Sequence, residues 1–101
     1  METPAILQQL NGAMEYLEAR LGDEIDLNDL ARVACVAPDS FLRFFSYMTG
    51  MSLREYIRRR RVTRAAYELR ATNAKVIDVA VRYGYDSADA FSRAFIRQHG
   101  I

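Results

Sequence analysis

The stretch that most constrains the fold of this chain is Ser52–Ala71, with the sequence SLREYIRRRRVTRAAYELRA. It holds neither glycine nor proline and is rich in good helix formers, so it is predicted to form one helix. At about 100° per residue, the apolar side chains around Ile57 point away from those around Ala65. A surface helix of a single bundle shows one apolar face. Two opposite faces therefore predict a helix that packs first into one core and then into another.

Four consecutive arginines, Arg58–Arg61, lie in the middle of this stretch, and Arg64 follows them. If the stretch is helical throughout, it is about 27 Å long, at a rise of about 1.5 Å per residue. Arginines in a row radiate around a helix, so they cannot all face one surface. Some of them are expected to be solvated or to pair with Glu55 and Glu68. The stretch is therefore predicted to be a rigid, basic connector.

Length and composition restrict the possible functions. With 101 residues, half of them hydrophobic, the chain can form one domain or two very small ones. It shows neither a long apolar run nor a secretory signal, so we expect no membrane contact and a cytoplasmic location. The only cysteine is Cys35 and the only histidine is His99, which argues against a disulfide or a zinc site. No paired carboxylates or nucleophile–base pair appear, so neither an enzyme nor a cofactor is predicted.

The net charge of +1 hides an uneven distribution of charged residues. Residues 1–31 carry seven acidic residues and one basic residue, whereas residues 32–101 carry thirteen basic and six acidic ones. Twelve of those thirteen are arginine, whose planar guanidinium suits phosphate and guanine recognition. This asymmetry favours nucleic-acid binding, although solvated helix faces would also explain it.

The other helices are predicted from periodicity and from residues that favour helix ends. Pro4 opens a helical pattern that Gly22 is expected to end. Asp26 is the expected N-cap of a second helix, and Pro38 suits the first position of a third, which Gly50 ends.

A fifth helix is predicted around Val76–Ala80, and Ser87 or Asp86 can cap a sixth. The side chains expected in the core of the third and sixth helices are Phe41, Phe44, Phe45, Met48, Phe91 and Phe95.

Two segments of the chain resemble each other. Leu30–Phe45 aligns with Val79–Phe95 if the second turn holds one extra residue, and each segment has an arginine two residues before its final phenylalanine. In each, a small residue precedes the turn by four positions. A short helix, a tight turn and a second helix form the helix-turn-helix pattern. Two such pairs joined by a two-faced helix are more specific than one.

At these residues the sequence resembles the DNA-binding domain of AraC/XylS-type transcription regulators. The resemblance covers about Met14 to Ile101 and is carried by LNDLARVA, FLRFFSYMTGMSLREYIRRRRVTRAAYEL and IDVAVRYGYDSADAFSRAF. The segments YIRRRRVT and VRYGYDS are similar to the corresponding segments of the Mar/Sox/Rob-like subgroup. The resemblance implies an all-α domain over residues 1–101. Its two helix-turn-helix subdomains would lie at about residues 5–51 and 74–101, joined by a linking helix at about 52–71.

The resemblance implies sequence-specific binding of double-stranded DNA in transcription regulation. Both recognition helices would lie in successive major grooves, about 34 Å apart. It also implies RNA polymerase as a partner and leaves room for an effector domain C-terminal to Ile101. The alternative is a helical protein-interaction domain that docks through its acidic first helix and has no affinity for DNA.

The base-reading positions of the family fall on two groups of residues in this chain. They are Asp39, Leu42 and Arg43 in the first recognition helix, and Ala88, Asp89, Ser92 and Arg93 in the second. The arginines can donate two hydrogen bonds to guanine, Asp39 can accept one from cytosine N4, and the apolar side chains can contact a thymine methyl group. The candidate phosphate contacts are Arg58, Arg60, Arg61 and Arg64.

The chain departs from the family pattern in several places. Cys35 stands where the first turn usually has glycine, and Ala37 where a serine N-cap is common. Losing such a cap costs about 1 kcal/mol, which Asp39 is expected to offset in part through the helix dipole. His99 stands where the family has a core residue, and the chain stops at Ile101 where the family continues with another helix. We therefore expect a C-terminal truncation.

Overall fold

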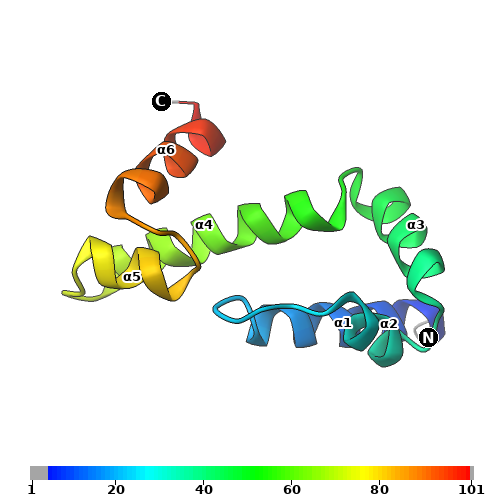
Figure 1. Cartoon of the computed structure of the whole chain (residues 1–101). Helices are drawn as coiled ribbons and strands as arrows, with labels where there is room; N and C mark the ends of the chain where they lie inside the picture. Colours follow the sequence, from blue (N-terminus) through cyan, green and yellow to red (C-terminus); the bar gives the residue numbers. More distant parts are fainter. Residues whose placement is uncertain (1–4, 101) are drawn as a thin grey trace. The chain divides into compact units, whose positions relative to one another are not determined.

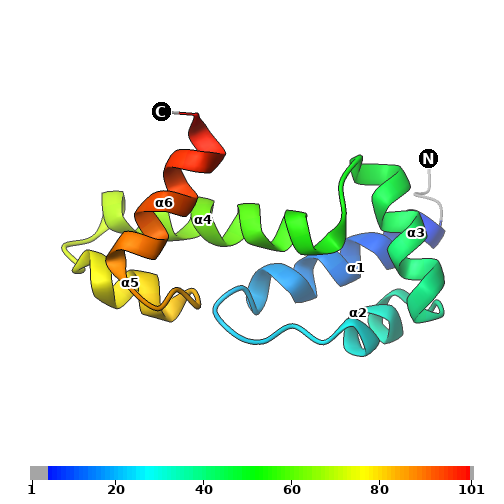
Figure 2. The ribbon, with the colours of Figure 1, turned by 45° about the horizontal axis from the view of Figure 1, so that its top comes forward.

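The computed structural model describes residues 5–100, and these form six α-helices without a strand (Figures 1 and 2). The helices are α1 (Ala5–Ala19), α2 (Leu27–Ala34), α3 (Pro38–Thr49), α4 (Leu53–Ala71), α5 (Val76–Arg82) and α6 (Ala88–His99). The all-α prediction is confirmed. Pro4 and Ile101, which figured in the sequence predictions, lie outside the described residues. The chain divides into two compact units with the boundary between Leu53 and Arg54; we call them unit 1 and unit 2.

Unit 1 contains α1, α2 and α3. Helix α1 packs along α2, which in turn packs on α3. The largest fully buried side chains of this unit are Leu17, Leu30, Phe41 and Phe45, one or two from each helix. The rings of Phe41 and Phe45 lie one helical turn apart with centroids separated by 6.0 Å. This cluster fixes which side of α3 faces inward, and so which side faces solvent.

Unit 2 contains nearly all of α4 together with α5 and α6. Its buried apolar side chains come from all three helices and from Tyr83, which follows α5: Val62, Ala65, Val79, Ala80, Tyr83, Phe91 and Ala94. The Val62 and Ala65 side chains belong to the second apolar face predicted for the connector. Helix α4 is continuous from Leu53 to Ala71, which confirms the single helix predicted for Ser52–Ala71, one residue shorter at its start.

The predicted end of α1 is wrong by two residues, because Gly22 was expected to follow a helix that reached Leu21. The helix ends at Ala19, followed by a turn in which Arg20 N–H donates to Leu17 O and Asp23 N–H to Arg20 O, each at 3.0 Å. The Arg20 guanidinium lies 3.5 Å from the centre of the Tyr16 ring and donates to the Tyr16 carbonyl. A basic side chain thus satisfies a terminal carbonyl, and no left-handed Gly22 is needed.

Two predicted core residues of α3 are less buried than expected. Phe44 is half-buried, and Met48 is 45% exposed. Phe95 of α6 is also half-buried. The reason is geometric. Phe41 and Phe45, four residues apart, lie at the centre of the apolar stripe of α3, so Phe44 and Met48 lie at its edge.

Within the described residues, no helix combines the length and the apolar character needed to cross a membrane.

Candidate nucleic-acid interface

The first helix-turn-helix is formed by α2, the turn at Cys35 and α3. Asp26 caps α2, as predicted: its carboxylate accepts from Asn28 N–H at 2.7 Å. Cys35 has φ +60° and ψ +38°, and among the described residues it is the one non-glycine residue with a positive φ. Val36 N–H then donates back to Ala31 O at 3.1 Å. The turn needs a left-handed residue, which explains why glycine would be expected at Cys35.

Cys35→Gly is expected to stabilise unit 1 by about 0.5–1 kcal/mol. A left-handed conformation costs an L-residue about 1–2 kcal/mol, and the greater freedom of glycine in the unfolded chain offsets part of the gain. Urea unfolding followed by circular dichroism measures the change. Gly84 has φ +89° in the other turn. The reciprocal variant Gly84→Cys should therefore lower the unfolding free energy of unit 2 by about 1 kcal/mol. A destabilised Cys35→Gly protein would contradict this explanation.

The second helix-turn-helix is formed by α5, a turn at Gly84 and α6. Gly84 is left-handed, and Tyr85 N–H donates to Ala80 O at 2.9 Å, which closes the turn over a fully buried alanine. Ser87 caps α6 as predicted, because its hydroxyl accepts from Ala90 N–H at 3.0 Å. The two helix-turn-helix units predicted from the repeated segments are confirmed.

The two recognition helices differ in their N-caps. Ala37 has the extended backbone of an N-cap but gives no side-chain hydrogen bond, and Pro38 takes the first helical position. Ala37→Ser should therefore stabilise unit 1 by about 1 kcal/mol, and Ser87→Ala should destabilise unit 2 by a similar amount. Thermal unfolding of both variants beside the parent is the measurement. If Ala37→Ser leaves the unfolding free energy unchanged, Asp39 already supplies the missing stabilisation through the helix dipole.

The candidate base-reading residues lie on α3 and α6. Asp39, Leu42 and Arg43 are exposed on α3, and Asp89, Ser92 and Arg93 are exposed on α6, whereas Ala88 at the first position of α6 is half-buried. The buried sides of the two helices are held by Phe41 and Phe91. The arginines are thus presented to solvent from helices whose opposite sides are fixed in a core.

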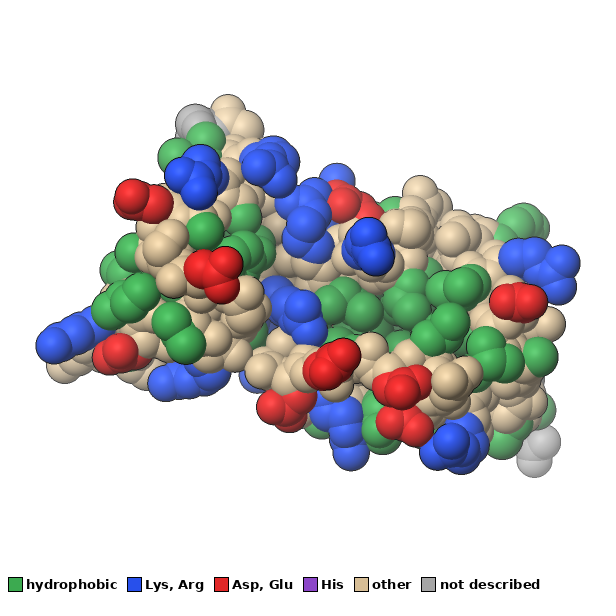
Figure 3. Space-filling view, in the orientation of Figure 1, with side chains coloured by type: hydrophobic (Ala, Val, Ile, Leu, Met, Phe, Trp, Pro, Cys, Tyr) green, Lys and Arg blue, Asp and Glu red, His purple; other side chains and the backbone are tan. Residues whose placement is uncertain are grey.

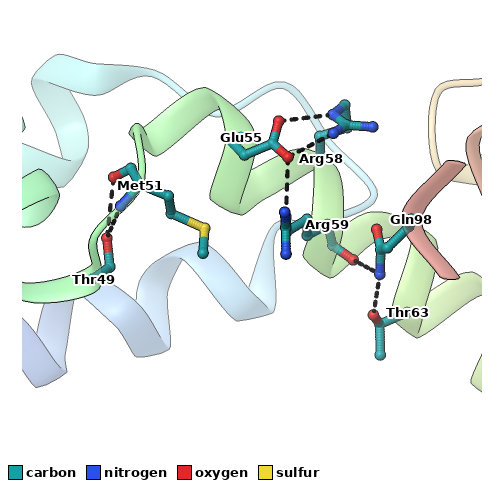
Figure 4. A network of polar contacts seen from close by, with 7 residues as sticks. All are labelled: Thr49, Met51, Glu55, Arg58, Arg59, Thr63 and Gln98. Carbon is teal, nitrogen blue, oxygen red and sulfur yellow. Dashed lines mark hydrogen bonds and ion pairs between the residues drawn. The ribbon is translucent and has the colours of Figure 1, made fainter. Parts of the chain in front are cut away.

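The arginines of α4 are not equivalent. Arg58 donates Nε and Nη2 to the Glu55 carboxylate at 3.1 and 2.6 Å, and Arg59 Nε donates to the same carboxylate at 3.0 Å (Figure 4). The hydrogen bond from Arg58, then that from Arg59, lowers the pKa of Glu55. The ion pairing predicted with Glu55 is confirmed for these two arginines.

The Arg58 guanidinium is also partly enclosed in unit 2. Its third nitrogen, Nη1, is buried and has no hydrogen-bond partner. Burial raises the pKa of Tyr85, and the charge of nearby Arg58 acts in the opposite direction. Within unit 2, the contact that holds the Arg58 guanidinium is its ion pair with the Glu55 carboxylate.

Four polar contacts that the sequence did not predict hold α5 and α6 on α4. Gln98 Nε2 donates to Arg59 O at 3.3 Å and to Thr63 Oγ1 at 3.0 Å (Figure 4). Glu68 accepts from the Tyr83 hydroxyl at 2.5 Å and forms an ion pair with Arg82. Burial first, and then the bond to Glu68, raises the pKa of Tyr83. These contacts set the position of the second recognition helix on its support.

The surface of unit 2 carries charge of both signs. In Figure 3, basic side chains lie over α6 and over the middle of α4, with acidic side chains between them. Arg93 and Arg97 are exposed on α6, and Arg64 is exposed on α4, whereas Arg60 and Arg61 are half-buried. Among the described residues, no group of histidine, cysteine and acidic side chains could hold a metal ion.

Comparison with known proteins places these features in a family. A family model described as "Helix-turn-helix domain" matches residues 30–101. The HTH-type transcriptional activator AarP of Providencia stuartii is 40% identical over 86 residues, which covers 85% of this chain and 64% of that protein. The transposon Tn10 TetD protein of Escherichia coli is 39% identical, with coverage of 79% and 58%. The chain thus spans less than two thirds of the length of these relatives.

Solved structures agree with this result. A transcriptional regulator from Chromobacterium violaceum with an AraC-type DNA-binding domain has a TM-score of 0.84 at 22% identity, with 94% of this chain and 85% of that chain covered. It supports the fold alone. The DNA-binding domain of AdpA, solved in complex with a target DNA, has a TM-score of 0.76 at 28% identity, with 91% and 83% covered. The chain belongs to the helix-turn-helix family of AraC-type DNA-binding domains, which bind specific DNA sequences to regulate transcription.

Proposed function

We propose that α3 and α6 are the base-reading helices of this chain and that they enter successive major grooves of one DNA duplex. The observation that carries the proposal is that Arg43 and Arg93 are exposed on helices whose opposite sides are buried through Phe41 and Phe91. An arginine in the major groove can donate two hydrogen bonds to O6 and N7 of guanine. Each arginine would therefore specify a guanine in its own half of the site.

The neighbouring side chains would add specificity around each guanine. Asp39 and Asp89 can accept a hydrogen bond from cytosine N4, and Leu42 can contact a thymine methyl group. Ser92 can reach a base or a phosphate, and Ala88 can offer only an apolar contact. Carboxylates repel phosphates, so the two aspartates are expected to raise discrimination between sequences more than they raise overall affinity.

Arginines of α4 are proposed as phosphate contacts. The set is Arg58, Arg60, Arg61 and Arg64. Phosphate contacts position the protein on the duplex and carry no sequence information. Because Arg58 already donates twice to Glu55, a phosphate would have to compete with that carboxylate.

Arg61→Ala is expected to weaken binding to all sequences alike and to lower the slope of log affinity against log salt by about one. Fluorescence anisotropy at several salt concentrations gives the slope. Arg58→Ala serves for comparison, since it also leaves Glu55 with one partner fewer and should lower the stability of unit 2. An Arg61→Ala protein with altered base preference and an unchanged slope would assign Arg61 to base reading.

The decisive experiment is selection of bound sequences from random duplex DNA, repeated at two salt concentrations. The proposal expects enrichment of a long, asymmetric site, bound by a single chain and weakened by salt. If no sequence is enriched, and the chain instead binds a protein partner independently of salt, the proposal fails.

The wider role is also a proposal. We expect regulation of transcription in the cytoplasm and contact with RNA polymerase on DNA; any separate effector domain would lie C-terminal to this chain. Support for the regulatory role comes from relatives described as transcriptional activators and regulators. Retention of purified RNA polymerase on promoter fragments, with and without the chain, tests the polymerase contact.

A further inference from the structure

The two recognition helices have the same length and the same ends. Helices α3 and α6 each contain 12 residues, and each closes on a left-handed glycine, Gly50 at φ +76° and Gly100 at φ +70°. In each glycine the backbone N–H donates to the carbonyl four residues earlier. Every position of α3 therefore corresponds to the position 50 residues later in α6.

Four of these twelve positions hold the same residue in both helices. They are Asp39 and Asp89, Phe41 and Phe91, Arg43 and Arg93, and Phe45 and Phe95. The phenylalanines are explained by packing, because they form the inward sides of the helices. Phe41, Phe45 and Phe91 are at most 5% exposed. The shared phenylalanines also mean that both helices turn the same side toward their own core.

Packing does not explain the other two identities. Asp39, Arg43, Asp89 and Arg93 are all exposed. Within each helix the aspartate stands at the second position and the arginine at the sixth, and residues four apart lie on the same face of a helix. Each recognition helix thus presents the same acidic and basic groups, at the same height and on the same outward side.

We infer that α3 and α6 read the same pair of bases, a guanine through the arginine and a cytosine through the aspartate. The preferred DNA would then consist of two sub-sites, one for each helix, that share this guanine and cytosine at the same spacing. This inference rests on the proposed function. It goes further because it states what the two halves of the site have in common.

The alignment of α3 with α6 also predicts where the two sub-sites differ. The position just before each arginine holds Leu42 in α3 and Ser92 in α6, and both are exposed. Leucine can contact a thymine methyl group, whereas serine can give or accept a hydrogen bond. The sub-sites are therefore expected to differ at the base that faces this position.

The aspartates have an alternative explanation that involves no base. A carboxylate in the first turn of a helix is stabilised by the helix dipole. In that case the neutral variants Asp39→Asn and Asp89→Asn would alter the stability of each helix and leave base preference unchanged. Base preference therefore distinguishes recognition from a merely structural role.

The test is selection from random duplex DNA with the parent chain and with each asparagine variant. The parent is expected to enrich two sub-sites with a shared guanine and cytosine. Asp39→Asn should lower the preference for cytosine about tenfold in one sub-site. Asp89→Asn should lower it by the same factor in the other sub-site. The control Asp78→Asn removes an exposed charge from α5. It should change affinity for all sequences without changing preference.

An exchange variant gives a second, independent measurement. In the double variant Leu42→Ser with Ser92→Leu, the preferences at the differing base should move from one sub-site to the other. Circular dichroism verifies that the helices are retained. If selection yields no preferred sequence, the proposed function itself fails. If a specific site appears but its halves share no guanine and cytosine, or if both asparagine variants keep the parent preference, the inference is wrong while the proposed function stands.

Discussion

Ala65→Pro is expected to destabilise unit 2 by about 3 kcal/mol or more. Ala65 is fully buried in the interior of α4. Proline removes a backbone donor there, and its ring clashes with the carbonyl of Arg61. Val62 and Ala65 form the α4 part of the core on which α5 and α6 depend. A kink or a break at this point should therefore release the second recognition helix from its support.

The consequence for DNA binding follows from the proposal of two base-reading helices in one chain. Each helix raises the effective concentration of the other at its part of the site. Without a folded unit 2, affinity for the full site should fall to that for the half-site read by α3. Fluorescence anisotropy on full and half sites, beside circular dichroism, measures both effects.

Ala65→Gly is the matched control. It removes the same side chain but keeps the backbone donor and brings no ring, so it should cost about 1 kcal/mol. Unit 1 should remain folded in both variants, because Leu17, Leu30, Phe41 and Phe45 provide its own core. If Ala65→Pro binds the full site as tightly as the parent, the model of two readers supported by one helix is wrong.

Local signals made most of the fold predictable. Asp26 and Ser87 cap their helices through short-range hydrogen bonds, Pro38 starts α3, and Gly50 ends it. Each of these features depends on residues only a few positions apart, so the sequence displays it directly. The alignment of the two repeated segments also placed Cys35 in the first turn, opposite Gly84, but its left-handed conformation was not predicted.

The features that could not be predicted depend on tertiary contacts. Gln98 meets Arg59 and Thr63 across 39 and 35 residues, and Glu68 meets Tyr83 across 15. No periodicity or spacing rule selects such partners. The early end of α1 is a different case, because it depends on how the Arg20 side chain lies on the Tyr16 ring.

The candidate site was predictable in part for the same reason. The helical period places Arg43 and Arg93 on the outward sides of helices whose inward sides hold phenylalanines, and the structure exposes both arginines. The sequence left several ion pairs open to the connector arginines, and the pair of Arg58 with Glu55 was one of them. Which bases and phosphates are contacted stays a prediction.

Arg43→Ala and Arg93→Ala are each expected to lose about 1–3 kcal/mol of binding free energy on the preferred site. The loss arises because a good two-bond contact to guanine discriminates against the other bases by about this amount. Since each helix reads its own sub-site, the two variants should relax preference at two different positions. Competition binding with single-base substitutions across the site measures this directly.

Stability is not expected to account for these losses. Both arginines are exposed, and surface substitutions usually change the unfolding free energy by less than about 0.5 kcal/mol. Arg70→Ala, at an exposed position in the last turn of α4, removes the same charge away from the recognition helices. It should weaken all sequences slightly and equally. The base preferences of Arg43→Ala and Arg93→Ala could instead match those of Arg70→Ala. In that case α3 and α6 do not read bases through Arg43 and Arg93, and these two arginines contact only the phosphate backbone.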